Sequence, residues 1–275
     1  QAGAADKSTK LNTGVIEMSS DVFYDLEKRF RRKLNHTARF YPVDLHCHSP
    51  LSYCFGRKDG VKDDDIQATP EQVAIAGCNR GLYLLAITDH HQSENAVYIS
   101  EACKKIKSSG ENLYLNNNLI ILPGMEICVE ENTKNVHILA LFPEWCSSYE
   151  IEHILDDTGI EPNPKNRKEQ SKVTTKRLSE IVKRIRARSG LAILAHVNST
   201  NGYREAMKSL GWEDDKILQS ICDLDINAVE ISKPEDAQHF VRDGRLLPCI
   251  IGSDAHYLKD IGGKEYITRV KMSEP

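Results

Sequence analysis

DLHCHS, residues 44–49, follows an apolar lead-in that contains Phe40 and Val43. The lead-in predicts a β-strand, and side chains two positions apart on a strand share a face. His46 and His48 therefore point from the end of this strand toward the same place, which suits a divalent metal ion. Alone, such a pair is a weak signal, because most pairs of this kind lie on a surface or in a core. The metal interpretation gains force because later apolar runs also end in His, Asp or Glu.

Short apolar runs alternate with amphipathic segments through most of the chain. We expect further strands at 82–88, 119–122, 136–142, 191–195, 228–231, 249–251 and 266–272. We expect helices at 71–79, 95–108, 147–157, 174–188, 213–222 and 234–242. Polar residues stand mostly at the C-terminal ends of the strands, which is the layout of a parallel β/α barrel with its functional groups on one rim. The sequence therefore predicts an α/β fold of this kind.

Eight potential metal ligands stand at or near the ends of the expected strands: His46, His48, His90, Glu126, His137, His196, Asp254 and His256, with Asp89 beside them. His137 differs from the rest because it stands near the beginning of its run. Imidazoles and carboxylates with few thiolates favour zinc, manganese or iron over a Cys-rich structural zinc site. One ion takes about four to six ligands, so eight imply two or three ions. Such a centre can clamp both the attacking and the leaving oxygen in phosphoryl transfer.

The remaining histidines lack this strand-end context. They are His36, His91, His153 and His239, and we expect them to be structural or exposed. His91 follows His90 directly, so on a strand it would point to the opposite face.

Length and patterning suggest two parts. A chain of 275 residues suits one α/β barrel with an additional N-terminal piece. We predict an arm and an amphipathic helix in residues 1–39 and the barrel in residues 40–275. The helix presents a basic face, namely Lys28, Arg29, Arg31, Arg32 and Lys33. That face could contact phosphates, although a solvated face is the commoner role of such residues.

Composition excludes several classes of protein. No apolar run approaches the roughly 20 residues needed to cross a bilayer, so we expect that the chain is not a membrane protein. The eight cysteines form no C-x-x-C pair, which indicates reduced thiols in a cytoplasmic protein. A net charge of −4 argues against a surface that grips nucleic acid everywhere, although a local patch could do so. There is no P-loop motif in the chain.

Six motifs occur in a fixed order at the expected strand ends: DLHCHS (44–49), ITDH (87–90), GME (124–126), VHILALF (136–142), LAH (194–196) and GSDAH (252–256). Together they resemble the PHP (polymerase and histidinol phosphatase) family of metal-dependent phosphoesterases, over residues 43–256. The resemblance implies a distorted (β/α)7 barrel, here with an N-terminal helical extension, and a three-metal site. It also implies that the eight residues above are the ligands and that Asp89 is a site carboxylate that positions or protonates.

Residues 255–272 also resemble the end of the PHP module in TrlF-type proteins, in which an ATPase follows on the same chain. That resemblance implies a nucleic-acid substrate and an ATPase region or partner.

The chain departs from the family pattern after the second histidine. Many members place Asp or His a few residues later, where this chain has Ser52, Tyr53 and Cys54. A ninth ligand could be Cys54, or Asp59 or Asp63 from the loop, or one ion could be weakly held. The sequence leaves these alternatives open.

The predicted activity is hydrolysis of a phosphoester by a hydroxide that the metal ions generate. The favoured substrate is DNA or RNA, within a larger ATPase-linked protein. The alternatives are a small-metabolite phosphatase and a non-catalytic, metal-stabilised binding module. Lys233 is a candidate phosphate contact, although most such lysines are simply exposed.

Overall fold

The computed structural model describes residues 39–58, 61–62, 67–109, 119–162, 172–242, 244–263 and 265–272. Residues 40–270 form one compact unit, and the description below concerns that unit. The predicted N-terminal helix, with its basic face and His36, lies outside the described residues. The division of the chain at residue 39 therefore stays a prediction.

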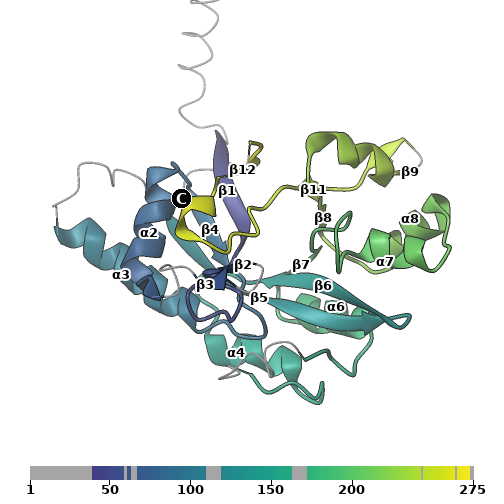
Figure 1. The fold of residues 1–275 in the computed structure, drawn as a ribbon, viewed down its shortest axis with the longest axis horizontal. Helices are drawn as coiled ribbons and strands as arrows, with labels where there is room; N and C mark the ends of the chain where they lie inside the picture. The colour runs from purple at the N-terminus through teal and green to yellow at the C-terminus, as the bar shows by residue number, and fades with distance from the viewer. Residues whose placement is uncertain are drawn as a thin grey trace, which may run out of the picture. The chain divides into compact units, whose positions relative to one another are not determined.

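One sheet of eight strands organises the unit, in the order β11-β8-β7-β6-β5-β4-β1-β12 (Figure 1). The strands are β1 (Arg39–Cys47), β4 (Leu84–Ile87), β5 (Ile120–Glu131), β6 (Lys134–Leu141), β7 (Leu191–Leu194), β8 (Ala228–Glu230), β11 (Cys249–Ile250) and β12 (Thr268–Met272). The segment after β11 returns to β1, where the Asp254 N–H donates to the His46 carbonyl at 2.8 Å and the His48 N–H donates to the Ala255 carbonyl at 3.1 Å. These bonds nearly close the sheet into a barrel, which confirms the predicted fold class.

The direction of β6 is the main distortion of the barrel. The pairs β1–β4, β4–β5, β7–β8 and β8–β11 are parallel, whereas β6 runs antiparallel to both β5 and β7. A two-residue turn makes the reversal: Asn132 and Thr133 have φ values of 50° and 67° and join the paired residues Glu131 and Lys134. Paired positive φ values give a turn whose twist matches that of the two strands. Because β6 is reversed, its first residues lie at the edge where the parallel strands end.

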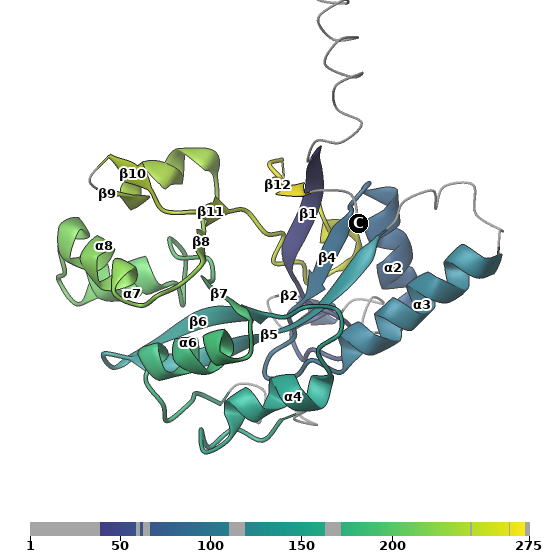
Figure 2. The ribbon, with the colours of Figure 1, turned by 180° about the vertical axis from the view of Figure 1, so that it is seen from behind.

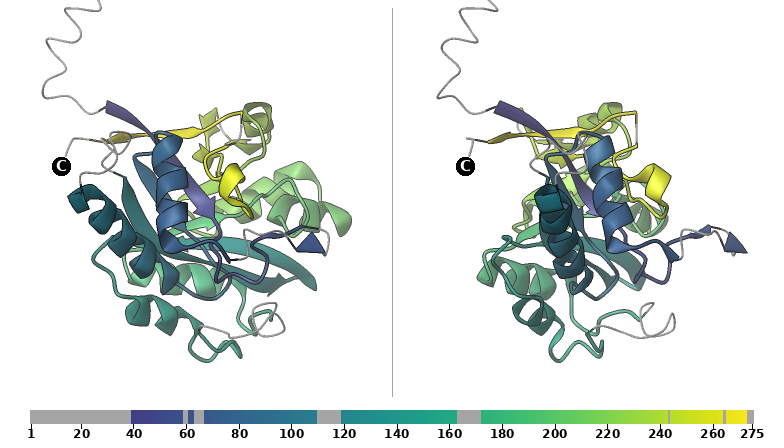
Figure 3. Two further views of the ribbon diagram at one scale, coloured as in Figure 1. Left: turned by 60° about the vertical axis from the view of Figure 1, so that its left-hand side comes forward. Right: turned by 90° about the vertical axis from the view of Figure 1, so that its left-hand side faces the viewer.

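Helices flank the strands. The α-helices are α2 (Pro70–Asn79), α3 (Asn95–Ser109), α4 (Ser148–Glu152), α6 (Leu178–Ala187), α7 (Tyr203–Ser209) and α8 (Asp214–Cys222). Helices α2 and α3 lie side by side (Figure 3). Thr69 begins α2 by accepting the Gln72 N–H, and Pro70 occupies the first turn, where a missing N–H has no consequence.

Short 3-10 helices and two small hairpins complete the described structure. These are η3 (His153–Leu155), η4 (Pro234–Phe240), η5 (Leu258–Asp260), β2 (Arg57–Lys58) with β3 (Val61–Lys62), and β9 (Val241–Arg242) with β10 (Arg245–Leu246). The helix expected at 234–242 is therefore a 3-10 turn that runs into β9. Among the described residues, none of the helices combines the length and the apolar composition needed to cross a bilayer.

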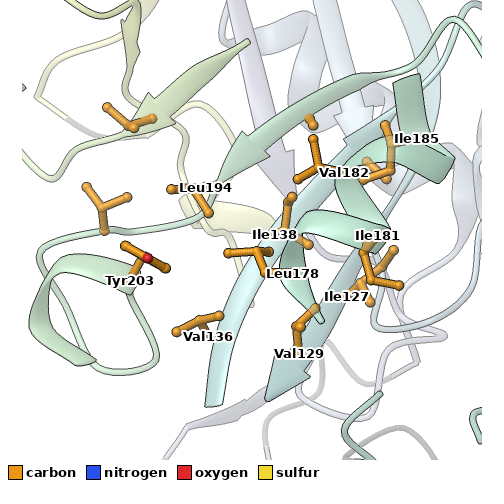
Figure 4. Packing of buried hydrophobic residues seen from close by; sticks show 14 of the residues in the cluster. Ile127, Val129, Val136, Ile138, Leu178, Ile181, Val182, Ile185, Leu194 and Tyr203 are labelled. Carbon is orange, nitrogen blue, oxygen red and sulfur yellow. The ribbon is translucent and has the colours of Figure 1, made fainter. Parts of the chain in front are cut away.

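Part of the larger core lies between α6 and the β5–β6 hairpin (Figures 2 and 4). Helix α6 buries Leu178, Ile181, Val182 and Ile185, at the three- and four-residue spacing of one helix face. They pack with residues of β5 and β6 that alternate toward the same side, namely Ile127, Val129, Val136 and Ile138. Each such side chain stabilises the fold by about 1.5–3 kcal/mol when fully buried. The packing of α6 thus fixes β5 and β6, the strands that carry Glu126 and His137.

Candidate metal centre

The structure brings all eight predicted ligands to one edge of the barrel. His46 and His48 come from the end of β1, His90 follows β4 and His196 follows β7. Glu126 lies in β5 beyond the part that pairs with β4, and forms a bridge with His90. His137 joins them from the beginning of β6, and Asp254 and His256 come from the segment after β11.

A cavity of about 390 Å³ opens over this edge. Its lining consists of His48, Tyr53, Cys54, His90, Glu126, His137, His196, Ser199, Thr200, Asn201, Glu230, Ile231, Ser232, Asp254 and His256. The lining is polar and, as described, contains neither Lys nor Arg. His46 lies deeper, fully buried beneath it.

Four groups of side chains have potential ligand atoms within 4.8 Å of one another. They are His46–His48–Glu126, Glu126–His137–His196, His48–Asp254–His256 and His48–Cys54–His90. Glu126 is common to two groups and His48 to three, so the groups form one continuous cluster. Each of the eight predicted ligands appears in it, and Cys54 is an addition.

The hydrogen bonding of the buried imidazoles fits metal ions. His46 Nε2, His196 Nδ1 and both ring nitrogens of His48 are buried and have no hydrogen-bond partner. A buried polar atom without a partner costs about 1–3 kcal/mol, so such atoms are rare unless a ligand satisfies them. Neutral imidazole nitrogens beside carboxylates are ordinary donors for zinc, manganese or iron. The donor set therefore suits divalent cations, although the role of each residue as a ligand stays a prediction.

Glu126 is the central carboxylate. Its Oε1 lies 2.6 Å from His137 Nδ1 and 3.2 Å from His196 Nε2, and its Oε2 lies 3.2 Å from His48 Nε2. Burial opposes its ionisation, but the facing imidazoles of His137, His90 and His46 outweigh burial and hold the pKa of Glu126 well below its usual value. The ionised form is the one that binds a cation.

The same electrostatic coupling acts on His46. Burial lowers the pKa of this imidazole, but the carboxylates of Glu230, Asp254 and Glu126 more than compensate and raise it well above its usual value. The carboxylates of the cluster therefore stabilise a positive charge at this position. Protons or metal cations can supply that charge.

Glu230, at the end of β8, holds several parts of the cluster in place. Its buried carboxylate accepts hydrogen bonds from His46 Nδ1 at 2.8 Å, from the His196 N–H at 2.9 Å and from the Gly252 N–H at 3.2 Å. The first bond leaves His46 Nε2 facing the other ligands, which is the usual arrangement behind a metal-binding histidine. Sequence reasoning missed Glu230, although it ends an expected strand just as several predicted ligands do.

Asp89 lies behind His48 and does not line the cavity. Its Oδ1 accepts the Ser49 N–H at 2.7 Å and lies 3.9 Å from His48 Nδ1, and its Oδ2 accepts the Ser49 hydroxyl. Burial raises the pKa of Asp89 to about 6. Of the two roles that the family resemblance implied for Asp89, this placement favours positioning over proton transfer to a substrate.

Other predicted residues lie apart from the cluster. Lys233 is exposed and does not line the cavity. His91 is buried and its Nε2 lies 3.0 Å from the Lys172 carbonyl, whereas His153 pairs with Asp156 and His239 contacts Arg204. Of the candidates for a ninth ligand, Cys54 joins the cluster, while Asp59 and Asp63 lie outside the described residues.

No family model and no curated protein sequence matches this chain. Solved structures do match it. A protein of Bifidobacterium adolescentis with a provisional assignment as a metal-dependent phosphoesterase aligns with 84% of this chain and 92% of its own, at 17% identity and a TM-score of 0.50. An amidohydrolase from Chromobacterium violaceum aligns with 80% of this chain and 90% of its own, at 20% identity and a TM-score of 0.52.

The lesion-specific endonuclease Q of Pyrococcus furiosus aligns with 82% of this chain at 18% identity and a TM-score of 0.52. This chain spans about half of that endonuclease, 51% of its length. At such low identities the matches establish a shared fold.

Proposed function

We propose that this chain is a PHP-type phosphoesterase that uses two or three divalent metal ions, and that its natural substrate is DNA or RNA. The observation that carries the proposal is the convergence of eight predicted ligands, several with unpartnered buried nitrogens, beneath a polar cavity. A structural metal site would be closed, whereas a catalytic one keeps open positions for water and substrate. The cavity above the cluster provides that access.

Divalent ions held there would supply a hydroxide nucleophile at neutral pH and stabilise the charge that develops on the phosphoryl group. The chain's own residues would hold the ions and orient the side chains that bind them. Glu126 joins two of the ligand groups, and Glu230 fixes the orientation of His46. Ser199, Thr200 and Asn201 line the cavity beside the ligands, where their side chains can donate hydrogen bonds to phosphate or sugar oxygens.

Three observations support a nucleic-acid substrate within a larger, ATPase-linked protein. The fold is shared with a protein described as a lesion-specific endonuclease. The chain resembles TrlF-type proteins over residues 255–272. The sequence also predicts a basic helix face at residues 28–33, which lies outside the described structure. Since the described cavity lining has no Lys or Arg, phosphate binding there depends on metal cations, and further contacts with a long substrate must come from elsewhere.

Removing ligands from β1 tests the chemistry. We expect the double variant His46→Ala/His48→Ala to lose at least about 100-fold in phosphoesterase activity, since even outer-shell changes reduce metal affinity or activity by about 10–100-fold. His153→Ala is the matched control, because His153 is a partly exposed histidine outside the cluster. A double variant that folds and retains wild-type turnover would place the chemistry elsewhere. If wild type binds metal but hydrolyses no phosphoester, the chain is a metal-stabilised binding module.

A substrate panel tests the nucleic-acid proposal. We would compare labelled single- and double-stranded DNA and RNA with phosphorylated metabolites at two salt concentrations. Nucleic-acid binding should weaken steeply with salt, in proportion to the phosphates contacted. Charge reversal at Arg29, Arg31 and Arg32 should weaken binding without changing hydrolysis of a small phosphodiester. A metabolite turned over orders of magnitude faster, without salt-sensitive nucleic-acid binding, would favour the phosphatase alternative.

A further inference from the structure

We propose that Cys54 is a metal ligand, and that with His48 and His90 it forms a thiolate-containing subsite that takes zinc in preference to manganese or magnesium. The proposal rests on the metal centre of the proposed function. It gives that centre two chemically unlike parts, because the other three ligand groups contain only nitrogen and oxygen donors.

The position of the sulfur is the first support. Cys54 Sγ lies within 4.8 Å of ligand nitrogens of both His48 and His90, and its side chain also contacts His256. Cys54 is half-buried and lines the cavity. It therefore faces the centre with three imidazoles around it.

The turn that carries Cys54 is held in place on both sides. The Ser52 N–H donates to the Ser49 carbonyl at 2.9 Å, and the Phe55 N–H donates to the Ser52 carbonyl at 3.1 Å. Next along the chain, Phe55 is buried, and the Gly56 N–H donates to the His256 carbonyl at 2.6 Å. The backbone around Cys54 is thus tied to a residue of the cluster itself, which fixes the sulfur at this side of the cavity.

The unpartnered nitrogens of His48 are the second, independent support. This ring is fully buried; Nδ1 has no hydrogen-bond partner, and Nε2 lies 3.2 Å from Glu126 Oε2 and 3.4 Å from Asp254 Oδ1 but makes no bond of hydrogen-bond geometry. The carboxylate nearest to Nδ1 is Asp89, at 3.9 Å. A cation at the Cys54 side would give one of these nitrogens a partner and would neutralise a thiolate in the same step.

The donor chemistry selects the ion. Zinc prefers four ligands drawn from thiolate and imidazole, and His256, which contacts Cys54, is a candidate for the fourth. Manganese and magnesium prefer oxygen donors, so a sulfur ligand disfavours them. Ser52 Oγ lies 3.1 Å from Cys54 Sγ, where its hydroxyl can donate to a thiolate and steady it.

The test uses the full chain loaded with zinc alone, X-ray absorption at the zinc edge, and the number of ions bound per chain. Wild type should show a zinc–sulfur distance of about 2.3 Å beside the zinc–nitrogen distances of about 2.0–2.1 Å. Cys54→Ser should lose the sulfur signal and bind about one ion fewer. Cys54→Asp should regain the ion without sulfur, and its preference for zinc over manganese should fall at least about 10-fold. Cys222→Ser is the matched control, because Cys222 is also half-buried and belongs to none of the ligand groups.

The outcomes separate the proposal on Cys54 from the proposed function on which it rests. A wild-type protein that binds zinc with no sulfur signal overturns the role of Cys54 and leaves the rest of the centre intact. A sulfur signal that survives in Cys54→Ser but disappears in Cys222→Ser also overturns it. If wild type binds no zinc but hydrolyses a phosphoester with manganese, the role of Cys54 is overturned and the proposed function stands. Circular dichroism of each variant shows whether a lost ion reflects a lost fold.

Discussion

Replacing Glu230 by Gln would test how far a buried carboxylate governs the centre. Glu230 Oε2 accepts hydrogen bonds from His46 Nδ1 and the His196 N–H, and Oε1 accepts the Gly252 N–H. Gln has the same shape but only one acceptor oxygen. If that oxygen replaces Oε2, the amide NH2 faces the Gly252 N–H, and a buried donor without a partner costs about 1–3 kcal/mol.

The two remaining bonds also weaken, because their acceptor loses its charge. A hydrogen bond to a charged group contributes about 1 kcal/mol more than a neutral one, so the pair loses roughly 2 kcal/mol. We therefore expect Glu230→Gln to lower the free energy of unfolding of the metal-free protein by about 3–5 kcal/mol. Zinc affinity should fall about 10–100-fold, because His46 loses the carboxylate that orients it.

Urea unfolding and competitive zinc titration measure the two effects separately. Glu131→Gln is a suitable control, because Glu131 accepts a single backbone N–H, from Leu178 at the start of α6, and lies outside the ligand groups. That variant should lose at most about 1–2 kcal/mol and keep its zinc affinity. The reasoning is wrong if Glu230→Gln binds zinc within about twofold of wild type, or if both variants lose the same stability.

Three further predictions concern the same region. An alanine Cβ at Gly252 would lie 2.5 Å from Glu230 Oε1 and 2.6 Å from His46 Cβ. Gly252→Ala should therefore lower the stability measured by thermal unfolding by about 1–3 kcal/mol and weaken zinc binding. A zinc titration identical to that of wild type would contradict this. In the metal-free protein Cys54 should be alkylated before Cys128 near neutral pH. Burial raises the pKa of both thiols, and the pKa of Cys128 is about 12. For Cys54 the neighbouring His48 outweighs burial and holds the pKa well below its usual value. Mass spectrometry gives the order, and equal rates would count against it. A chelator should abolish phosphoesterase activity and Mn2+ should restore it at least as well as Mg2+, so activity that survives exhaustive chelation would exclude a metal mechanism.

The position of most site residues, but not of His137, follows from the order of the apolar runs. In a parallel barrel the strand ends meet at one edge, so residues that follow apolar runs can be placed together from the order of the runs alone. His137 stands at the beginning of its run and fits that rule only if its strand is reversed. The structure shows this reversal in β6, which the Asn132–Thr133 turn produces. A two-residue turn leaves little trace in hydrophobic periodicity.

The features that escaped prediction depend on side-chain direction. Asp89 and His90 are adjacent after β4, yet His90 lines the cavity and Asp89 lies behind it. Glu230 ends β8 and its carboxylate contacts His46 Nδ1, but a single Glu in a short apolar run is not distinctive. The sequence offers Cys54 only as one of several candidates for a ninth ligand, because it lies in a turn without periodicity and its approach to the cluster depends on backbone bonds. Residue type can be read along the chain, but direction at a strand end depends on tertiary contacts.

The closure between β1 and the segment after β11 also bears on how the protein folds. Ser253 Oγ donates to the His46 carbonyl across 207 residues of sequence, and Asp44 accepts the N–H groups of both Ser253 and Gly262. Contacts between such distant parts of a chain form late, because a long loop must be ordered before they contribute. During synthesis His46 and His48 emerge long before Asp254 and His256. The nascent chain therefore carries an incomplete ligand set until its last strands dock, so the complete metal centre can form only near the end of folding.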